Sequence, residues 1–191
     1  MRIRRAGPQD ASSIAGVYVR SWKGAYPGLI PQSYLDALSA QECIGVWDET
    51  IATSAWPRRG VIVLLGPVEP DDGHEGPITG FVSFGPTRDE DHDTGFDAGT
   101  VGEIVTFYLD PTAFGSGGAD LLMSAALVAL RAADFTTAML WVLGTNTRAR
   151  RFYERRGWRS DGTTKVHDWG AFVATDERYV IDVTAGQGTP T

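Results

Sequence analysis

The segment from residue 101 to residue 133 limits the folds open to this chain more than any other. It reads VGEIVTFYLDPTAFGSGGADLLMSAALVALRAA: a strand pattern that ends at Pro111, a turn rich in glycine, and a helical pattern with Leu122, Ala126 and Ala129 on one face. The backbone N–H groups of such a turn and the N-terminus of the helix that follows it both favour an anion. The segment therefore predicts an anion site, although the glycines could also serve only to turn the chain tightly.

Two familiar phosphate-binding patterns do not match this turn. No Gly-Lys-Ser/Thr follows the glycines, so the turn is not a P-loop. A dinucleotide fingerprint that began at Gly115 would need glycine at position 120, where Asp120 stands. Asp120 suits the positive end of the helix dipole, but its carboxylate would compete with a bound phosphate unless it points away.

A second motif, NTRARRFYERRGW, covers residues 146–158. Asn146 is a favourable N-cap residue and Gly157 is a favourable residue just beyond a helix C-terminus. The spacing of Ala149, Phe152 and Tyr153 gives the predicted helix one apolar face, and its arginines form a basic stripe. The same pattern is also typical of an ordinary capped amphipathic helix.

Strand and helix patterns alternate along the rest of the chain. Strands are predicted at residues 1–6, 60–66, 78–85, 101–110 and 136–144 and in a C-terminal hairpin, and helices at 8–22, 32–52 (in one piece or two), 118–133 and 146–156. This order predicts an α/β or α+β domain with a mixed sheet. We assign residues 1–183 to a single domain and the small polar residues 184–191 to a flexible C-terminal tail.

Composition and charge exclude several classes of protein. The net charge of −7 disfavours nucleic-acid binding, which needs a basic face. Cys43 is the only cysteine, so no internal disulfide forms and a reducing, cytoplasmic location is expected. No run of about 18 apolar residues is present, so we expect no membrane association. The three histidines and the cysteine lack metal-site spacing, so no metal is expected.

The two motifs together resemble the GCN5-related N-acetyltransferase (GNAT) family. That family carries R/Q-x-x-G-x-G/A at the start of a helix and, after one more strand, N-x-x-A-x-x-F-Y-x-x-x-G-F/W. The second motif matches at all six defined positions, which are Asn146, Ala149, Phe152, Tyr153, Gly157 and Trp158. The first matches at Gly117 and Ala119 only, because Phe114 stands where Arg or Gln is expected. The resemblance extends over roughly residues 1–183, since the order of the elements also fits.

The resemblance implies a fold and a co-substrate. The fold is a twisted, mostly antiparallel sheet of about seven strands with about four helices, in which two neighbouring strands splay apart at the site. The co-substrate is acetyl-CoA, whose pyrophosphate would lie on the turn and whose pantetheine arm would follow the end of a strand. The implied binding residues are Phe107, Tyr108, Leu109, Gly115, Ser116, Gly117, Gly118, Ala119, Asp120 and Asn146.

Phe114 is the departure that bears most on this interpretation. A charge-assisted hydrogen bond from the missing Arg would be worth on the order of 1.5–3 kcal/mol, or roughly 10- to 150-fold in affinity. Arg148, Arg150 or Arg151 could compensate for it. Without compensation, the chain would be a catalytically idle acyl-CoA-binding or interaction module of the same fold.

Two residues are candidates for the proton transfers that acetyl transfer to an amine requires. A tyrosine hydroxyl stays protonated at pH 7, so Tyr153 could protonate the departing thiolate; its alternative role is packing. Glu103 is the preferred base because residues 103, 105, 107 and 109 share one side of a regular strand; its alternative is a solvent-facing carboxylate. His167, Asp168, Glu177 or a water molecule are weaker candidates for the base.

The acceptor is the least defined part of the interpretation. Trp22 and Tyr26 fall where relatives wall the acceptor site, and their rings could hold an amine or simply pack. The acidic run at residues 88–93 could attract a cation but is more typical of a solvated loop. We expect a primary amine of a small molecule as substrate; a protein lysine or N-terminus is the alternative. A homodimer is left open.

Overall fold

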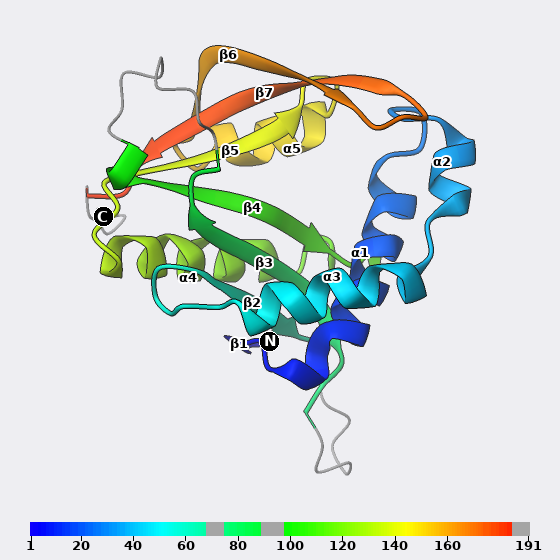
Figure 1. The fold of residues 1–191 in the computed structure, drawn as a ribbon, viewed down its shortest axis with the longest axis horizontal. Helices are drawn as coiled ribbons and strands as arrows, with labels where there is room; N and C mark the ends of the chain where they lie inside the picture. The colour runs from blue at the N-terminus through cyan, green and yellow to red at the C-terminus, as the bar shows by residue number, and fades with distance from the viewer. Residues whose placement is uncertain (68–74, 89–97, 185–191) are drawn as a thin grey trace.

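The computed structural model describes residues 1–67, 75–88 and 98–184, and within them one twisted sheet runs through the molecule (Figure 1). Its seven strands are β1 (Arg2–Arg5), β2 (Gly60–Leu65), β3 (Ile78–Pro86), β4 (Val101–Leu109), β5 (Thr137–Leu143), β6 (Arg159–Asp168) and β7 (Val173–Asp182). Their order in the sheet is β1-β2-β3-β4-β5-β7-β6, and only the pair β4 and β5 is parallel. The predicted mixed, mostly antiparallel sheet of seven strands is confirmed.

Five α-helices surround the sheet, one more than the expected count. They are α1 (Ala11–Ala25), α2 (Gln32–Ala37), α3 (Ala40–Ala52), α4 (Gly118–Ala132) and α5 (Thr147–Glu154). The additional helix arises because the segment 32–52 forms two helices. Its chain is extended at Leu38 and Ser39, with ψ of 124° at both residues, and this break separates α2 from α3.

Each face of the sheet has its own hydrophobic core, as β2 illustrates. All six residues of this strand, GVIVLL, are buried. Ile62 and Leu64 pack into the core formed with α4 and α5, whereas Val61, Val63 and Leu65 pack into the core formed with α1 and α3. Side chains alternate across a strand, so an uninterrupted apolar run of this length is typical of a strand covered on both faces.

The sheet splits between β4 and β5. Residues 101–104 of β4 pair with residues 137–140 of β5, but both strands continue beyond this ladder without pairing with each other. The splayed strand pair is therefore confirmed. It leaves the edge of β4 from residue 105 to residue 109 facing the split instead of a neighbouring strand.

A bulge in β4 corrects one prediction about the side chains of this strand. Ser83 pairs with Thr106 while Phe84 pairs with Ile104, so Val105 is the extra residue. The bulge reverses the alternation: Ile104 and Phe107 both face the core under α4. Glu103 therefore lies on the opposite face from Phe107, and the expectation that they share a face is wrong.

Two predictions fall mainly on residues outside the described ranges. Residues 185–191, most of the predicted tail, and residues 89–93 of the acidic run lie outside the described residues. In the described ranges, no helix is long and apolar enough to cross a membrane, and no group of three or more His, Cys, Asp or Glu side chains is arranged to hold a metal ion.

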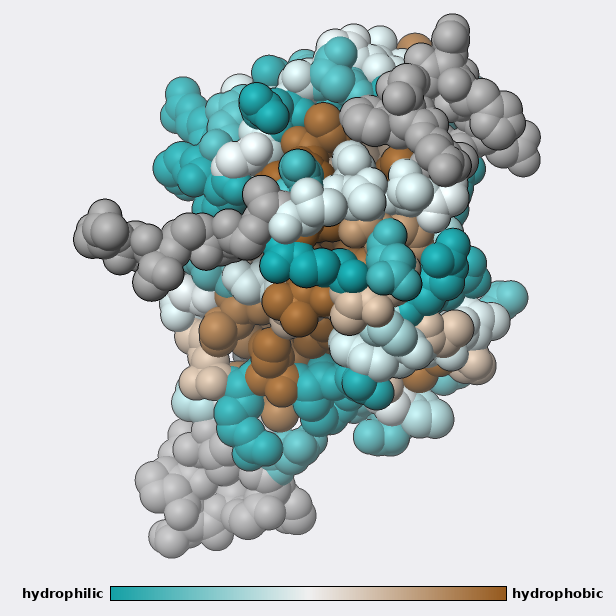
Figure 2. Space-filling view, turned by 90° about the vertical axis from the view of Figure 1, so that its left-hand side faces the viewer, coloured by the Kyte–Doolittle hydropathy of each residue, from teal (hydrophilic) through white to brown (hydrophobic). Residues whose placement is uncertain are grey.

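Figure 2 shows one side of the molecule, where apolar side chains gather in the middle of the face among hydrophilic ones.

Candidate functional site

A cavity of about 920 Å³ occupies the split between β4 and β5. Its lining comes from both faces of the sheet, because α4 and α5 contribute residues at one end while α1 and the β6–β7 hairpin contribute them at the other. The predicted site residues that line it are Trp22, Tyr26, Glu103, Phe107, Tyr108, Leu109, Gly115, Gly117, Ala119, Asp120, Asn146 and Tyr153. Of the predicted set, Ser116 and Gly118 do not line the cavity.

The glycine turn at the α4 end of the cavity offers backbone donors. Gly115 and Gly117 have φ of 76° and 83°, a conformation that glycine adopts without strain, and a Cβ atom added to either would meet nothing within 4 Å. Within the described part of the chain, the N–H groups of Gly115, Gly117 and Ala119 donate no hydrogen bond. The N–H groups of Ser116 and Gly118 instead donate to Ala113 O and Ser116 Oγ. The turn thus has three backbone donors without an acceptor among the described residues, as an anion site requires.

Arginine side chains adjust the charge around this turn. The carboxylate of Asp120 is held by Arg156, whose Nε donates to Oδ1 at 2.5 Å, so a cation offsets the charge that would repel an anion. The guanidinium of Arg148 lies 4.0 Å from the ring centroid of Phe114, and both residues line the cavity. Among the described residues, no carboxylate pairs with Arg148. Phe114 therefore supports a cation at the position where the family motif has its own polar side chain.

Tyr153 lines the cavity from α5. The helix starts as predicted, with Asn146 accepting a hydrogen bond from the N–H of Ala149 at 3.1 Å, and Gly157 follows it with φ of 84°. Tyr153 is buried, with its ring 6.4 Å from that of Phe107. Burial raises the pKa of Tyr153 above its ordinary value, and the neighbouring Tyr26 raises it further. The hydroxyl is therefore a neutral donor at pH 7.

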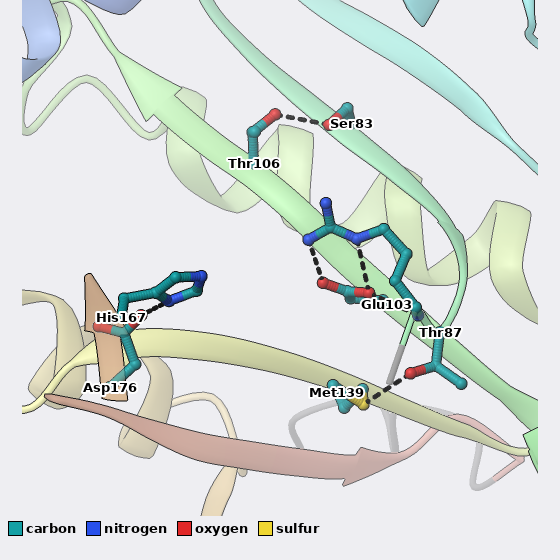
Figure 3. Close-up of polar contacts among 8 residues, drawn as sticks. Ser83, Thr87, Glu103, Thr106, Met139, His167 and Asp176 are labelled. Carbon is teal, nitrogen blue, oxygen red and sulfur yellow. Dashed lines mark hydrogen bonds and ion pairs between the residues drawn. The ribbon is translucent and has the colours of Figure 1, made fainter. Parts of the chain in front are cut away.

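Glu103 lines the cavity but is engaged by a partner. Its carboxylate accepts hydrogen bonds from Nη2, Nε and the backbone N–H of Arg88 at 2.7, 3.1 and 3.0 Å. The carboxylate is 3% exposed, so the Arg88 guanidinium is its main charge partner. Figure 3 shows Glu103 on β4 together with Thr106 of the same strand, which bonds with Ser83. A carboxylate fixed in this way is poorly placed to collect a proton from a substrate.

The opposite end of the cavity is lined mainly by aromatic rings. Trp22 is 5% exposed, and its ring lies 4.8 Å from Tyr26 and 5.6 Å from Trp169. Both predicted residues thus pack in an aromatic cluster and line the cavity at once. Burial raises the pKa of Tyr26, hydrogen bonding to Tyr108 opposes this, and the carboxylate of Asp176 raises it further.

The β6–β7 hairpin supplies residues that the sequence analysis missed or ranked low. His167, Trp169, Phe172 and Asp176 all line the cavity. Nδ1 of His167 lies 3.1 Å from Oδ2 of Asp176 (Figure 3). His167 pairs with Ala174 and Asp176 pairs with Lys165, so the two side chains meet diagonally across the hairpin, which could be predicted only with its register known.

Comparison with known proteins agrees with this geometry. The sequence model of the acetyltransferase (GNAT) family matches residues 33–158. The chain belongs to this family. The match extends from α2 to the tryptophan that ends the second motif, so it includes the glycine turn, the split and α5. The GNAT resemblance of the two motifs is confirmed.

Relatives with curated sequences and solved structures fit the same assignment. The uncharacterized N-acetyltransferase YuaI of Bacillus subtilis (strain 168) is 29% identical over 144 residues, which cover 75% of this chain and 72% of the relative. PaiA N-acetyltransferase from Thermoplasma acidophilum, solved in complex with coenzyme A, has a TM-score of 0.68 at 16% identity, with 95% and 98% of the two chains covered. YncA from Salmonella typhimurium, solved with its cofactor acetyl-CoA, has a TM-score of 0.64 at 16% identity, covering 100% and 98%. At these identities the solved structures establish the GNAT fold.

Proposed function

We propose that this GNAT-family acetyltransferase moves the acetyl group of acetyl-CoA to the primary amine of a small molecule, by direct attack in a ternary complex. One observation carries the proposal: the glycine turn, Tyr153 and the aromatic end all line a single cavity. A donor for an anion, a proton donor and a wall for an acceptor are thereby arranged around one cavity. The acetyl-CoA complexes of proteins with this fold support the choice of co-substrate.

The residues at the turn fit acetyl-CoA. The N–H groups of Gly115, Gly117 and Ala119 would hold the pyrophosphate, with Arg148 supplying a positive charge beside it. The unpaired edge of β4 from residue 105 to residue 109 offers backbone groups to the amides of the pantetheine arm. Phe114 does not close the site, since its ring supports Arg148.

The chemistry requires two proton transfers, one from a group of this chain to the sulfur and one from the amine to a base. When bound, acetyl-CoA supplies an acetyl group that forms a bond to the amine nitrogen as its bond to sulfur breaks. The sulfur must then receive a proton, and the hydroxyl of Tyr153, kept protonated by burial, can provide it. The amine must lose a proton, for which Glu103 lines the cavity but is bound to Arg88.

Calorimetric titration with acetyl-CoA, with NADH as the control dinucleotide, tests the first half of the proposal. We expect micromolar binding of acetyl-CoA and none of NADH. A screen of amines with detection of the released thiol tests the second half. Absence of binding at millimolar acetyl-CoA would contradict the proposal, whereas binding without turnover of any amine would favour the idle acyl-CoA-binding module.

A further inference from the structure

The aromatic end of the cavity has a surface suited to a flat molecule. The rings of Trp169 and Phe172 are nearly parallel, with an interplanar angle of 9° and centroids 6.0 Å apart. Trp22 packs edge to face against Trp169, and Tyr34 packs in the same way against Phe172 with ring centroids 5.0 Å apart. Neighbouring rings therefore hold Trp169 and Phe172 in place. Trp169 remains 40% exposed, so part of its ring is free for contact. Flat rings stack on such surfaces in offset or edge-to-face arrangements.

A buried donor at this end has no acceptor. The indole Nε1 of Trp22 is buried and has no hydrogen-bond partner within the described residues. The neighbouring Tyr108 hydroxyl is close enough for Trp22 to lower the pKa of that group, which burial raises, yet the geometry of a hydrogen bond is not met. A buried donor left without an acceptor is unfavourable, so this N–H suits a polar atom of a bound molecule.

The two carboxylates that line this end differ in their partners. In the ranges that the structure describes, Glu103 pairs with the guanidinium of Arg88, whereas Asp176 contacts the imidazole of His167. With Glu103 neutralised by Arg88, Asp176 is the carboxylate of this end that can offset one positive charge on a ligand. The wall therefore favours an amine on an uncharged, flat body over a polyamine or an aminoglycoside.

The His167–Asp176 pair has the geometry of an oriented base. An ionised carboxylate only accepts hydrogen bonds, so this contact directs Nδ1–H of His167 to Asp176, and Nε2 is the ring nitrogen at which a neutral imidazole can take a proton. The side chain of His167 is 42% exposed and lines the cavity, and in Figure 3 its imidazole projects toward the space between β4 and β5. His167, Asp176 and the proposed acid Tyr153 line the same cavity.

We propose that the acceptor is a primary amine on a short chain attached to a flat aromatic body, that the rings of Trp169 and Phe172 hold this body, and that His167, oriented by Asp176, takes the proton that the amine loses. This inference rests on the proposed acetyltransferase function and names its acceptor and its base.

The proton and bond balance is complete with the groups named. The amine nitrogen forms its bond to the acetyl carbon and loses one proton to Nε2 of His167. The bond from that carbon to sulfur breaks, and the sulfur takes the hydroxyl proton of Tyr153. Transfer of one proton from the His167 imidazolium back to the Tyr153 phenolate restores both residues. No oxidant, reductant or further reactant is required.

Binding of matched amines tests the acceptor class without turnover. The protein is loaded with CoA, which carries no acetyl group, and titrated calorimetrically with 2-phenylethylamine, 2-cyclohexylethylamine and spermidine. We expect 2-phenylethylamine to bind at least about fivefold more tightly than the other two, because only its ring is flat. Equal or tighter binding of 2-cyclohexylethylamine or spermidine would overturn the assignment of the acceptor.

A pair of tryptophan variants locates the bound ring. Trp169→Ala should weaken 2-phenylethylamine by about 2- to 10-fold, the range of an aromatic pair contact, and leave acetyl-CoA binding unchanged. Trp56→Ala is the matched control, since Trp56 is 38% exposed but lies outside the cavity lining. Equal loss in both variants, or none in Trp169→Ala, would overturn the role of the ring wall.

A pH profile tests the base. The other titratable or charged groups of the described cavity lining, by element, are Tyr18 on α1 and Tyr26 just after it, Arg88 after β3, Glu103 and Tyr108 on β4, Asp120 on α4, Arg148, Tyr153, Arg155 and Arg156 on or just after α5, Lys165 on β6 and Asp176 on β7. With the preferred amine, His167→Gln should lower kcat by about 10²- to 10⁴-fold and remove the rise in rate between pH 5 and 8, where histidines titrate. Glu103→Gln should keep that rise.

The outcomes separate this inference from the function beneath it. If acetyl-CoA binds and amines turn over but His167→Gln keeps both the rate and the pH-dependent rise, the base is overturned and the acetyltransferase stands. If the rise is lost in Glu103→Gln instead, Glu103 is the base. If acetyl-CoA does not bind at all, the proposed function and this inference both fail. Unchanged acetyl-CoA affinity in His167→Gln shows that the variant folds.

Discussion

The two ends of the cavity are built in different ways. At the α4 end, the donors are backbone N–H groups of one short segment, residues 115–119, and they persist whatever side chains flank them. At the other end, the wall consists of side chains that arrive from α1 and from the β6–β7 hairpin. Under the proposed function, the backbone donors would still bind acetyl-CoA with Phe114 in place of the Arg or Gln of the family motif. A single substitution in the ring wall, by contrast, would change which acceptor binds there. Proteins of the same fold can therefore share a co-substrate and still differ in the acceptor that they bind.

The largest expected effect lies where the two ends meet. Tyr153→Phe removes the hydroxyl and keeps the ring, so kcat should fall by about 10²-fold or more while acetyl-CoA affinity changes little. Steady-state kinetics together with calorimetry measures both quantities. An unchanged kcat would mean that Tyr153 only packs between the two ends, and its 7% exposure would then be explained by its ring contacts alone.

The next effect tests whether the backbone end depends on any side chain. Arg148→Ala should weaken acetyl-CoA by roughly 10- to 150-fold, the value of a charge-assisted contact of about 1.5–3 kcal/mol. Arg151→Ala is the matched control, because Arg151 is exposed on the same helix and outside the cavity lining. Equal affinities of the two variants would show that backbone donors alone hold the co-substrate, and would sharpen the contrast between the ends.

A buried carboxylate links the two ends and makes stability depend on pH. Asp110 accepts hydrogen bonds from the N–H and hydroxyl of Thr112, at the start of the turn, and from Nε of Arg20 on α1. Burial by itself would raise the pKa of Asp110, but these bonds lower it below the ordinary value. The stabilisation is therefore complete above about pH 4, the ordinary value, and is lost as the pH falls through the lower pKa of the folded state.

Asp110→Asn tests this link. At pH 7 we expect the free energy of unfolding in urea to fall by about 1 kcal/mol, the difference between charged and neutral hydrogen bonds. The deficit should shrink in acid, once Asp110 of the unchanged protein is protonated. A deficit that is the same at pH 7 and pH 3 would show that the loss does not come from the charge.

The smallest effect concerns the residue that departs from the family motif. Phe114→Ala removes the ring beneath Arg148 and should weaken acetyl-CoA by about 2- to 5-fold, the value of a cation–π contact of about 0.5–1 kcal/mol. In an Arg148→Ala background, Phe114→Ala should not weaken acetyl-CoA further, because the cation that the ring contacts is already absent. Full additivity of the two losses would show that Phe114 acts independently of Arg148.

Much of the fold and one end of the site could be predicted from local sequence. The α5 helix follows from Asn146 and Gly157, whose capping roles depend only on the next few residues. The glycine turn and the buried strand β2 are of the same kind, because conformation and alternation are properties of neighbouring residues. The split between β4 and β5 came from the family resemblance and not from any pattern along the strands.

What decides the acceptor end is the path of the chain in three dimensions. The bulge at Val105 depends on how β4 registers with β3, so no local pattern could reveal that Glu103 and Phe107 face opposite ways. The contact of Trp22 with Trp169 requires that α1 and the hairpin be placed against the same cavity, and the contact of His167 with Asp176 depends on the register of β6 with β7. The helices, the strands and the conformation of the glycine turn follow from the sequence alone, since they depend on residues a few positions apart. Only the tertiary structure decided which side chains share the cavity, because packing of distant segments selects them.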